Sequence, residues 1–272
     1  MSILHPMWLS SAVQIEVWKS NEWCRRGSGI IIRSESGHYL VTARHVVDEQ
    51  FVDGPKGRSP FDKVRIINPA FISFGGGQEF VEWEADWKFD ADENDLAATK
   101  IPGSDSGFYR AISADAILDE EQLNSLQIGH PLIMSGFPAL GGIHDERPLM
   151  VGRQGVLSSH PLREISIKDT LGRNYFLLDS FAQSGFSGAP LFAFERPEFS
   201  VASPISFGAI KINGETVSEG GEPQRFTYPR IQAGLAGIVC GHFRSALDRQ
   251  DGGHAGLSYC VAAHRATNLI DP

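Results

Sequence analysis

The sequence predicts an all-β protein whose strands form two successive sets. Short runs rich in β-branched and aromatic residues recur along the 272-residue chain, and turn formers such as Ser-Gly, Gly-Pro and Asn-Pro separate several of them. An acidic stretch at residues 113–129 lacks this pattern and divides the runs into an N-terminal and a C-terminal set. Many short strands at this spacing are typical of sandwiches and barrels, and two sets joined by one linker favour two barrels.

The N-terminal set predicts a first domain over residues 1–112. A linker over residues 113–128 follows it and has room for a helical turn. The expected strands of the first domain are 12–18, 27–34, 38–43, 63–74, 80–87 and 96–101.

The C-terminal set predicts a second domain over residues 129–272. Its stretch 195–230 is rich in Pro, Gly and Ser and is expected to be an inserted surface loop, and "HRATNLI" at 264–270 is expected to be a short closing helix. The expected strands of the second domain are 130–138, 149–159, 174–182, 188–194, 234–243 and 256–263.

The composition is that of a soluble globular protein, with 42% hydrophobic and 21% charged residues. The formal net charge of −9, without a basic stripe, argues against nucleic acids and other polyanions as partners. The N-terminus has no early Lys or Arg, and His5 and Pro6 interrupt its apolar run, so we expect no signal peptide; no apolar run approaches the length of a membrane span. Three widely spaced cysteines favour reduced thiols and a cytoplasmic location.

A histidine follows the end of one predicted strand. In "YLVTARHVVDE" the β-type run ends in Thr-Ala, and His45 comes two residues later. A general base is best carried just past the end of a rigid strand, where its ring faces a cleft. Taken alone, His45 is more simply an ordinary core or surface histidine, and His38, in the turn-like "ESGH", is a weaker candidate for a base.

An acidic cluster runs directly into another predicted strand. Asp95 is the last acid before "LAATKI", and a half-buried carboxylate there can accept an imidazole N–H and fix the tautomer of the ring. The alternative is a solvated acidic loop, to which we expect Asp90, Asp92 and Glu93 to belong.

A serine between glycines, in "AQSGFSGAPLF" at residues 182–192, is the candidate nucleophile. Small residues around Ser187 suit a tight turn, and they also suit a backbone whose N–H groups must approach an oxyanion. The residues alone leave both alternatives open, but the order His, Asp, Ser differs from the Ser, acid, His order of nucleophile-elbow hydrolases. It is the order of the chymotrypsin-type enzymes.

Several blocks in this order carry a family resemblance. "TARHVV", "NDLAATKI" and "SGFSGAPLF" resemble the triad blocks of chymotrypsin-fold serine peptidases, and are closest to the bacterial trypsin-like and HtrA-like branch. "GSGIII", "LIMSGFP", "GRQGVLSS" and "GLAGIVCG" resemble supporting strands, and "LLDSFAQSGFSGAP" resembles the run before the nucleophile, with Asp179 on the family's aspartate. The resemblance covers the chain from roughly Ser11 to Ile270.

The resemblance implies a chymotrypsin-like fold of two six-stranded antiparallel β-barrels, with the active site in the cleft between them. It implies a catalytic triad in which His45 is the base, Asp95 orients it and Ser187 is the nucleophile. The backbone N–H groups of Gly185 and Ser187 are then expected to form the oxyanion hole.

One departure from the family concerns the residue before the nucleophile. Secreted digestive members carry an Asp there, which receives the N-terminal amine released by zymogen cleavage, whereas this chain has Phe186. Activation by that ion pair is therefore excluded. The bulky ring leaves open that the oxyanion hole forms only when a substrate or partner binds.

The resemblance also suggests a substrate pocket. Phe181 falls near its base, and Ala236, Gly237, Ile238 and Val239 fall along one wall. Because no acid stands at the base position, a preference for Lys or Arg is not expected. We expect an uncharged apolar residue of small or medium size at the cleavage site.

A cluster of Cys and His near the C-terminus raises the question of a metal site. Its spacing, Cys-x-His followed by His-x5-Cys-x3-His, fits no familiar zinc pattern, so we expect core cysteines, loop histidines and no metal. A disulfide between the two cysteines is possible in principle. The cluster consists of Cys240, His242, His254, Cys260 and His264.

The sequence thus predicts an intracellular serine endopeptidase that acts on a protein or peptide substrate without a cofactor. Regulation by a protein partner or by an additional domain is expected, and neither nucleic acid nor membrane is an expected partner. The main alternative is a catalytically silent trypsin-like fold that serves as a binding or scaffold module. A hydrolase of another acyl ester is a third possibility, because a triad alone does not select the acyl group.

Overall fold

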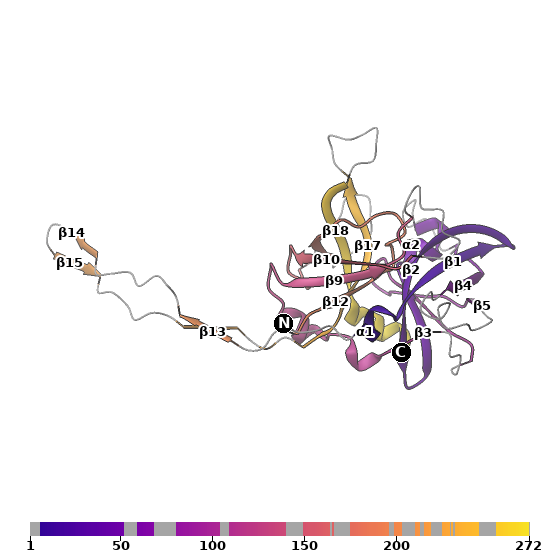
Figure 1. The fold of residues 1–272 in the computed structure, drawn as a ribbon, viewed down its shortest axis with the longest axis horizontal. Helices are drawn as coiled ribbons and strands as arrows, with labels where there is room; N and C mark the ends of the chain where they lie inside the picture. Colours follow the sequence, from indigo (N-terminus) through magenta and orange to yellow (C-terminus); the bar gives the residue numbers. More distant parts are fainter. Residues whose placement is uncertain are drawn as a thin grey trace.

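The computed structural model describes most of the chain, and strands dominate the described part. Figure 1 shows two β units side by side, the N-terminal strands in indigo and violet and the C-terminal strands in pink to yellow. The described residues are 6–51, 59–67, 80–103, 109–139, 149–163, 165, 175–195, 199–202, 210–212, 215–218, 225–228, 230, 232–244 and 254–271.

The N-terminal unit is one eight-stranded sheet. Its neighbour order is β5-β4-β1-β2-β3-β7-β6, and β8 pairs with β2 off this path. The β2–β8 pair is parallel and the others are antiparallel. The strands are β1 (Ala12–Lys19), β2 (Glu22–Ser34), β3 (Gly37–Thr42), β4 (Lys63–Ile67), β5 (Phe80–Glu84), β6 (Lys88–Phe89), β7 (Ala97–Lys100) and β8 (Ile112–Ser113).

The C-terminal unit is a closed antiparallel barrel. Its strands follow the order β10-β11-β18-β17-β12-β9, and the last strand closes on the first. Closure leaves no strand edge unpaired, which stabilises the barrel without a covering helix. The strands are β9 (Pro131–Gly136), β10 (Val151–Leu157), β11 (Tyr175–Asp179), β12 (Pro190–Ala193), β17 (Gly234–Arg244) and β18 (His254–Ala262).

The predicted chymotrypsin-like two-barrel fold is confirmed, with one difference in the first half. A six-stranded first barrel is expected, whereas the described residues form an eight-stranded sheet whose end strands β5 and β6 do not pair with each other. The two additional strands, β6 and β8, have two residues each. Runs this short leave no alternating pattern for the sequence to reveal.

The remaining elements are short helical turns. In the predicted linker, Asp119 and Gln122 form a capping box, in which the side chain of each residue accepts a hydrogen bond from the backbone N–H of the other. Helix α4 begins at this box, in the stretch where the sequence allows a helical turn. These elements are α1 (Pro6–Leu9), α2 (Arg44–Val47), η1 (Glu49–Phe51), η2 (Ala114–Ala116), α4 (Glu120–Asn124), η3 (Ala263–Ala266) and α5 (Thr267–Ile270).

The two ends of the described chain cross to the opposite units. In α1, Trp8 packs on Phe192 of β12 with ring centroids 5.7 Å apart, so the N-terminal end lies against the C-terminal barrel. After α5, Asp271 Oδ1 accepts a 2.7 Å hydrogen bond from Ser36 Oγ, beside β3 of the N-terminal sheet. The crossing segments tie the two units together.

The stretch expected as an inserted surface loop contains strands. β13 (Phe199–Ala202) pairs with β16 (Arg225–Tyr228), and β14 (Ile210–Ile212) pairs with β15 (Glu215–Ser218). In Figure 1 these strands form an arm that extends away from both units. The expectation of a loop is therefore wrong for these four segments, and the remainder of 195–230 is largely outside the described residues.

The core residue Phe192 gives a test of the packing between the N-terminal end and the barrel. Its side chain is fully buried against Trp8. We expect Phe192→Ala to lower the free energy of unfolding by about 3–5 kcal/mol, because a large cavity forms in a core that repacks only in part. Chemical denaturation measures this loss. Ile128→Ala is the control, since Ile128 is 70% exposed and its truncation should change stability by less than about 0.5 kcal/mol.

Candidate active site

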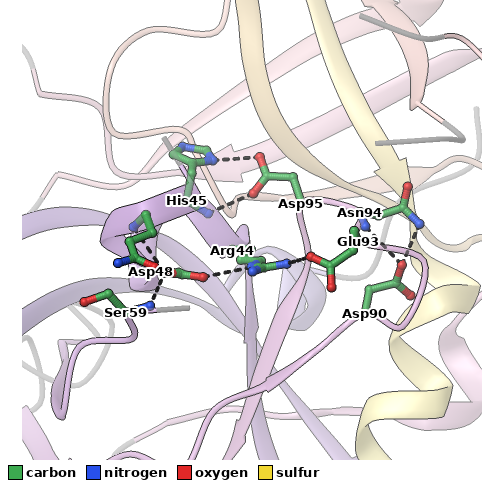
Figure 2. A network of polar contacts seen from close by, with 9 residues as sticks. Arg44, His45, Asp48, Ser59, Asp90, Glu93, Asn94 and Asp95 are labelled. Carbon is green, nitrogen blue, oxygen red and sulfur yellow. Dashed lines mark hydrogen bonds and ion pairs between the residues drawn. The ribbon is translucent and has the colours of Figure 1, made fainter. Parts of the chain in front are cut away.

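His45 lies on a single helical turn directly after β3. Two hydrogen bonds join this residue to one carboxylate: its backbone N–H donates to Asp95 Oδ1 at 2.8 Å, and its ring Nδ1 lies 2.7 Å from Asp95 Oδ2. The imidazole side chain is 27% exposed, whereas that of Asp95 is 4% exposed. The ring is therefore held on one side by a buried acid, as Figure 2 shows, and is partly exposed to solvent.

Asp95 comes from a tightly bonded turn that precedes β7. Asp90 Oδ2 accepts hydrogen bonds from the backbone N–H and the side-chain amide of Asn94, at 3.2 and 2.5 Å. Asp90 is only 5% exposed, so its expected place in a solvated loop is wrong. Asp92 remains solvent-exposed, but it accepts from Arg265 at 2.7 Å and is not a free loop charge.

A buried arginine joins the histidine turn to the turn that carries Asp95. Arg44 is 1% exposed; its Nε donates to Asp48 Oδ2 at 3.0 Å, and its Nη1 donates to Glu93 Oε2. Figure 2 shows its guanidinium between the two carboxylates. Since Arg44 and His45 are adjacent, this network and the two Asp95 hydrogen bonds fix both sides of the same turn.

Ser187 is half-buried in a turn between β11 and β12, the serine turn, which we define as residues 183–188. Its carbonyl oxygen accepts from the backbone N–H of Ser28 on β2 at 2.8 Å. A Cβ at Gly27 would lie 2.7 Å from Val46 Cγ1 and 3.2 Å from the same Ser187 oxygen. Val46, which follows His45, and the carbonyl group of Ser187 therefore both lie against Gly27. This contact brings the three predicted triad residues to one region.

The serine turn has two left-handed glycines whose surroundings exclude a side chain. Gly185 has φ +95° and Gly188 has φ +85°. A Cβ at Gly188 would lie 2.0 Å from Ser28 O, and one at Gly185 would lie 2.4 Å from Phe137 O. Both positions therefore require glycine.

The backbone donors of the serine turn point to an anion site. Gly185 O is occupied by Ser28 Oγ at 2.7 Å, whereas the N–H groups of Gly185 and Ser187 donate to no acceptor among the described residues. Two unpaired N–H groups two residues apart on one tight turn can converge on a single negative oxygen. This is the arrangement that the sequence predicts for these two residues.

The serine hydroxyl and the imidazole do not form a hydrogen bond in the part of the chain that the structure describes. Rotation about the Cα–Cβ bond moves the Ser187 hydroxyl without moving the backbone. In enzymes without bound substrate such hydrogen bonds are often long and tighten when substrate binds.

The residues predicted to line the pocket occupy two different environments. Phe181 is 46% exposed, as a contact for substrate requires, whereas Ala236, Ile238 and Val239 are fully buried. A Cβ at Gly237 would collide with Phe176 at 2.7 Å. These four residues of β17 lie in the packed core. They can support the wall of a pocket, but they are not exposed to a bound substrate.

Cys240 is a site residue that the sequence analysis did not assign. Its Sγ donates to the carbonyl oxygen of Asp95 at 3.4 Å and is 1% exposed. Burial, together with the negative charge of Asp95, raises the pKa of the thiol, which stays protonated and able to donate. The only sequence signal for it is its place directly after the predicted pocket wall.

The predicted absence of a metal site concerns a cluster that the structure describes only in part. No group of three or more His, Cys, Asp or Glu side chains suited to a metal occurs among the described residues. Cys240 and Cys260 are free thiols in different core clusters, so they do not form the disulfide that the sequence left open. No helix in the described ranges is long and apolar enough to cross a membrane.

Comparison with known proteins identifies similar sequences and folds. Residues 27–197 match the family model described as "Trypsin-like peptidase domain". The serine endoprotease from Yersinia pestis superposes with a TM-score of 0.51 at 17% identity, covering 97% of this chain and 63% of that one, so the chain spans less than two thirds of that relative. The MamO protease domain from Magnetospirillum magneticum superposes with a TM-score of 0.54 at 13% identity, covering 99% of this chain and all of that one. No curated protein matched.

The thiols give a test of the site's packing. Cys24 is partly exposed, whereas Cys240 and Cys260 are buried with raised pKa values. We expect one thiol to react with a chromogenic disulfide reagent at pH 8 in the native protein and all three to react after denaturation, because protonated, buried thiols are poor nucleophiles. Cys24→Ser should abolish the native signal. Rapid reaction of two or three native thiols would contradict the burial of Cys240 and Cys260.

Proposed function

The chain belongs to the family of trypsin-like peptidase domains, and we propose that it is a serine endopeptidase that hydrolyses protein or peptide substrates through an acyl-enzyme. The observation that carries the proposal is the pair of hydrogen bonds from His45 to Asp95. A carboxylate held by the backbone N–H and facing the ring Nδ1 fixes the imidazole so that Nε2 is free to accept a proton.

In the proposed mechanism, Ser187 Oγ attacks the carbonyl carbon of the scissile peptide bond while His45 Nε2 takes the hydroxyl proton. The negative oxygen that forms accepts hydrogen bonds from the N–H groups of Gly185 and Ser187. His45 then gives its proton to the leaving amine, and the acyl group stays on Ser187. Water, deprotonated by His45, hydrolyses the ester and regenerates the serine.

The surroundings of Asp95 support a preorganised orientation of His45. Asp95 is buried and fully paired, so it orients His45 at no cost in reorganisation when the imidazolium forms. Cys240 adds a thiol donor at the carbonyl of Asp95. The three free thiols support the proposal that the protein works in a reducing compartment such as the cytoplasm.

The proposal also covers how the enzyme is activated and which residue it prefers at the cleavage site. The bulky Phe186 next to the nucleophile, and a serine hydroxyl that is not yet hydrogen-bonded to His45, support activation by a substrate, a partner protein or a further domain. An exposed aromatic ring at Phe181, without an acid at the pocket base, supports an uncharged apolar residue at the cleavage site.

A second candidate function is a silent peptidase fold that binds proteins without cleaving them. The unformed hydrogen bond between Ser187 and His45 favours it. The two candidates differ in one measurable property, the reactivity of the serine hydroxyl, because an unactivated serine reacts slowly with electrophiles.

Substitution of the nucleophile tests the proposed function. A fluorophosphonate probe should label the wild-type protein, forming an Oγ–phosphorus bond and releasing fluoride, whereas Ser187→Ala should remain unlabelled and should not hydrolyse peptides. Thermal unfolding should be similar in both proteins. Ser158→Ala, at a partly exposed serine directly after β10, is the matched control and should be labelled at the wild-type rate. Absence of labelling in the wild-type protein, with and without protein partners, would support the silent fold.

Substitution of the orienting acid tests the role of its two oxygens. In Asp95→Asn, the amide oxygen can keep the bond from the His45 backbone N–H, so the amide NH2 faces the ring Nδ1. This fixes the tautomer that carries its proton on Nε2, and we expect kcat to fall on the order of 10⁴-fold with little change in fold. Steady-state kinetics measure the loss. Asp115→Asn removes a similar charge from an exposed acid of the predicted linker and should retain activity.

A further inference from the structure

The arginine at position 153 holds the segment that leads into the nucleophile. We propose that Arg153 is a positioning residue of the oxyanion hole: its guanidinium fixes residues 181–186 so that the N–H groups of Gly185 and Ser187 face the substrate carbonyl. This inference rests on the proposed function and names a residue outside the triad as a determinant of the catalytic rate.

The strand geometry explains why Arg153 faces the serine turn. Exposure alternates along β10: Gly152, Gln154 and Val156 face solvent, whereas Gly155 and Leu157 are buried. Arg153 lies on the same face as Gly155 and Leu157, because side chains two residues apart in a strand share a face. A Cβ at Gly155 would lie 2.7 Å from Asp179 O, so β10 and the end of β11 lie in close contact at that point.

Four contacts join the Arg153 guanidinium to the segment before Ser187. Nη1 donates to the carbonyl oxygen of Phe181 at 2.9 Å, and Nη2 donates to Gln183 Oε1 at 3.2 Å. The guanidinium carbon lies 5.8 Å from the ring centroids of both Phe181 and Phe186. One planar group therefore fixes a backbone carbonyl, a side-chain amide and two rings, within reach of cation–π attraction.

The serine turn needs such an external constraint. Gly185 and Gly188 supply the left-handed φ angles of the turn, and glycine adopts other φ angles at little cost. Ser28 Oγ holds Gly185 O from the N-terminal sheet, and Ala139 N donates to Ser184 O at 2.8 Å. Arg153 holds the opposite end of the segment, so the peptide that carries the Gly185 N–H is restrained from both directions.

The guanidinium of Arg153 donates its hydrogen bonds to neutral acceptors. No described carboxylate forms an ion pair with it, so no acid in the described part of the chain offsets its positive charge beside the serine turn. A fixed cation near a developing negative charge stabilises the transition state more than the ground state. The residue should therefore affect kcat more than KM.

The test measures Ser187 reactivity in Arg153 variants. We expect Arg153→Met, which keeps the apolar stem, to lower kcat for a peptide ester and the rate of fluorophosphonate labelling by up to about 10²-fold, the effect of losing one oxyanion donor, with KM changed less than threefold. Arg153→Lys should be intermediate, because an ammonium replaces one of the two donors and keeps the charge. Arg163→Met, an exposed arginine of the same unit, is the matched control and should react at the wild-type rate.

The outcomes separate this inference from the proposed function. A wild-type protein that the probe does not label at Ser187 overturns the proposed function and this inference with it. A labelled wild type together with Arg153→Met labelled at the same rate overturns the role of Arg153 alone. Should Arg153→Met fail to fold, as judged by its thermal transition, Arg153→Lys decides: a folded Lys variant with wild-type kcat overturns the inference, and a folded one with reduced kcat and unchanged KM supports it.

Discussion

Ser28 is the residue on which the geometry of the site depends, because each of its polar groups is bonded to another part of the site. Its N–H donates to Ser187 O, its hydroxyl donates to Gly185 O and accepts from Phe137 N, and its carbonyl accepts from Thr42 Oγ1. The side chain is completely buried. One residue of the N-terminal sheet thus bonds the serine turn, the end of β9 and the strand that leads to His45.

The second constraint is the buried arginine beside the histidine. A cation that is 1% exposed is strongly destabilising unless it is paired, and Arg44 is paired with Asp48 and Glu93 and lies 4.7 Å from the ring centroids of Phe51 and Phe89. Such a network contributes little net stability compared with an apolar core, but its hydrogen-bond directions allow only one arrangement. It thereby sets the angle at which the His45 turn meets the Asp95 turn.

Much of the fold and the centre of the site could be predicted from the sequence because order along the chain is itself informative. The two sets of strands, the linker helix and the positions of His45 and Asp95 follow from runs of apolar residues and from what stands at their ends. The contacts of Arg153, Arg44 and Cys240 could not be predicted, because each depends on which face of a strand or turn meets another element. The burial of Asp90 was missed for the same reason: an acidic run looks solvated until a partner such as Asn94 is placed beside it.

The crossed ends of the chain have a consequence for biosynthesis. Arg265, in η3, donates to Asp92 in the turn that carries Asp95, and α5 follows it. These contacts can therefore form only after the strands of both units have been translated. A nascent chain that contains His45, Asp95 and Ser187 but has not yet reached Arg265 lacks this support, so the turn that carries Asp95 gains its contact with the C-terminal segment late in synthesis.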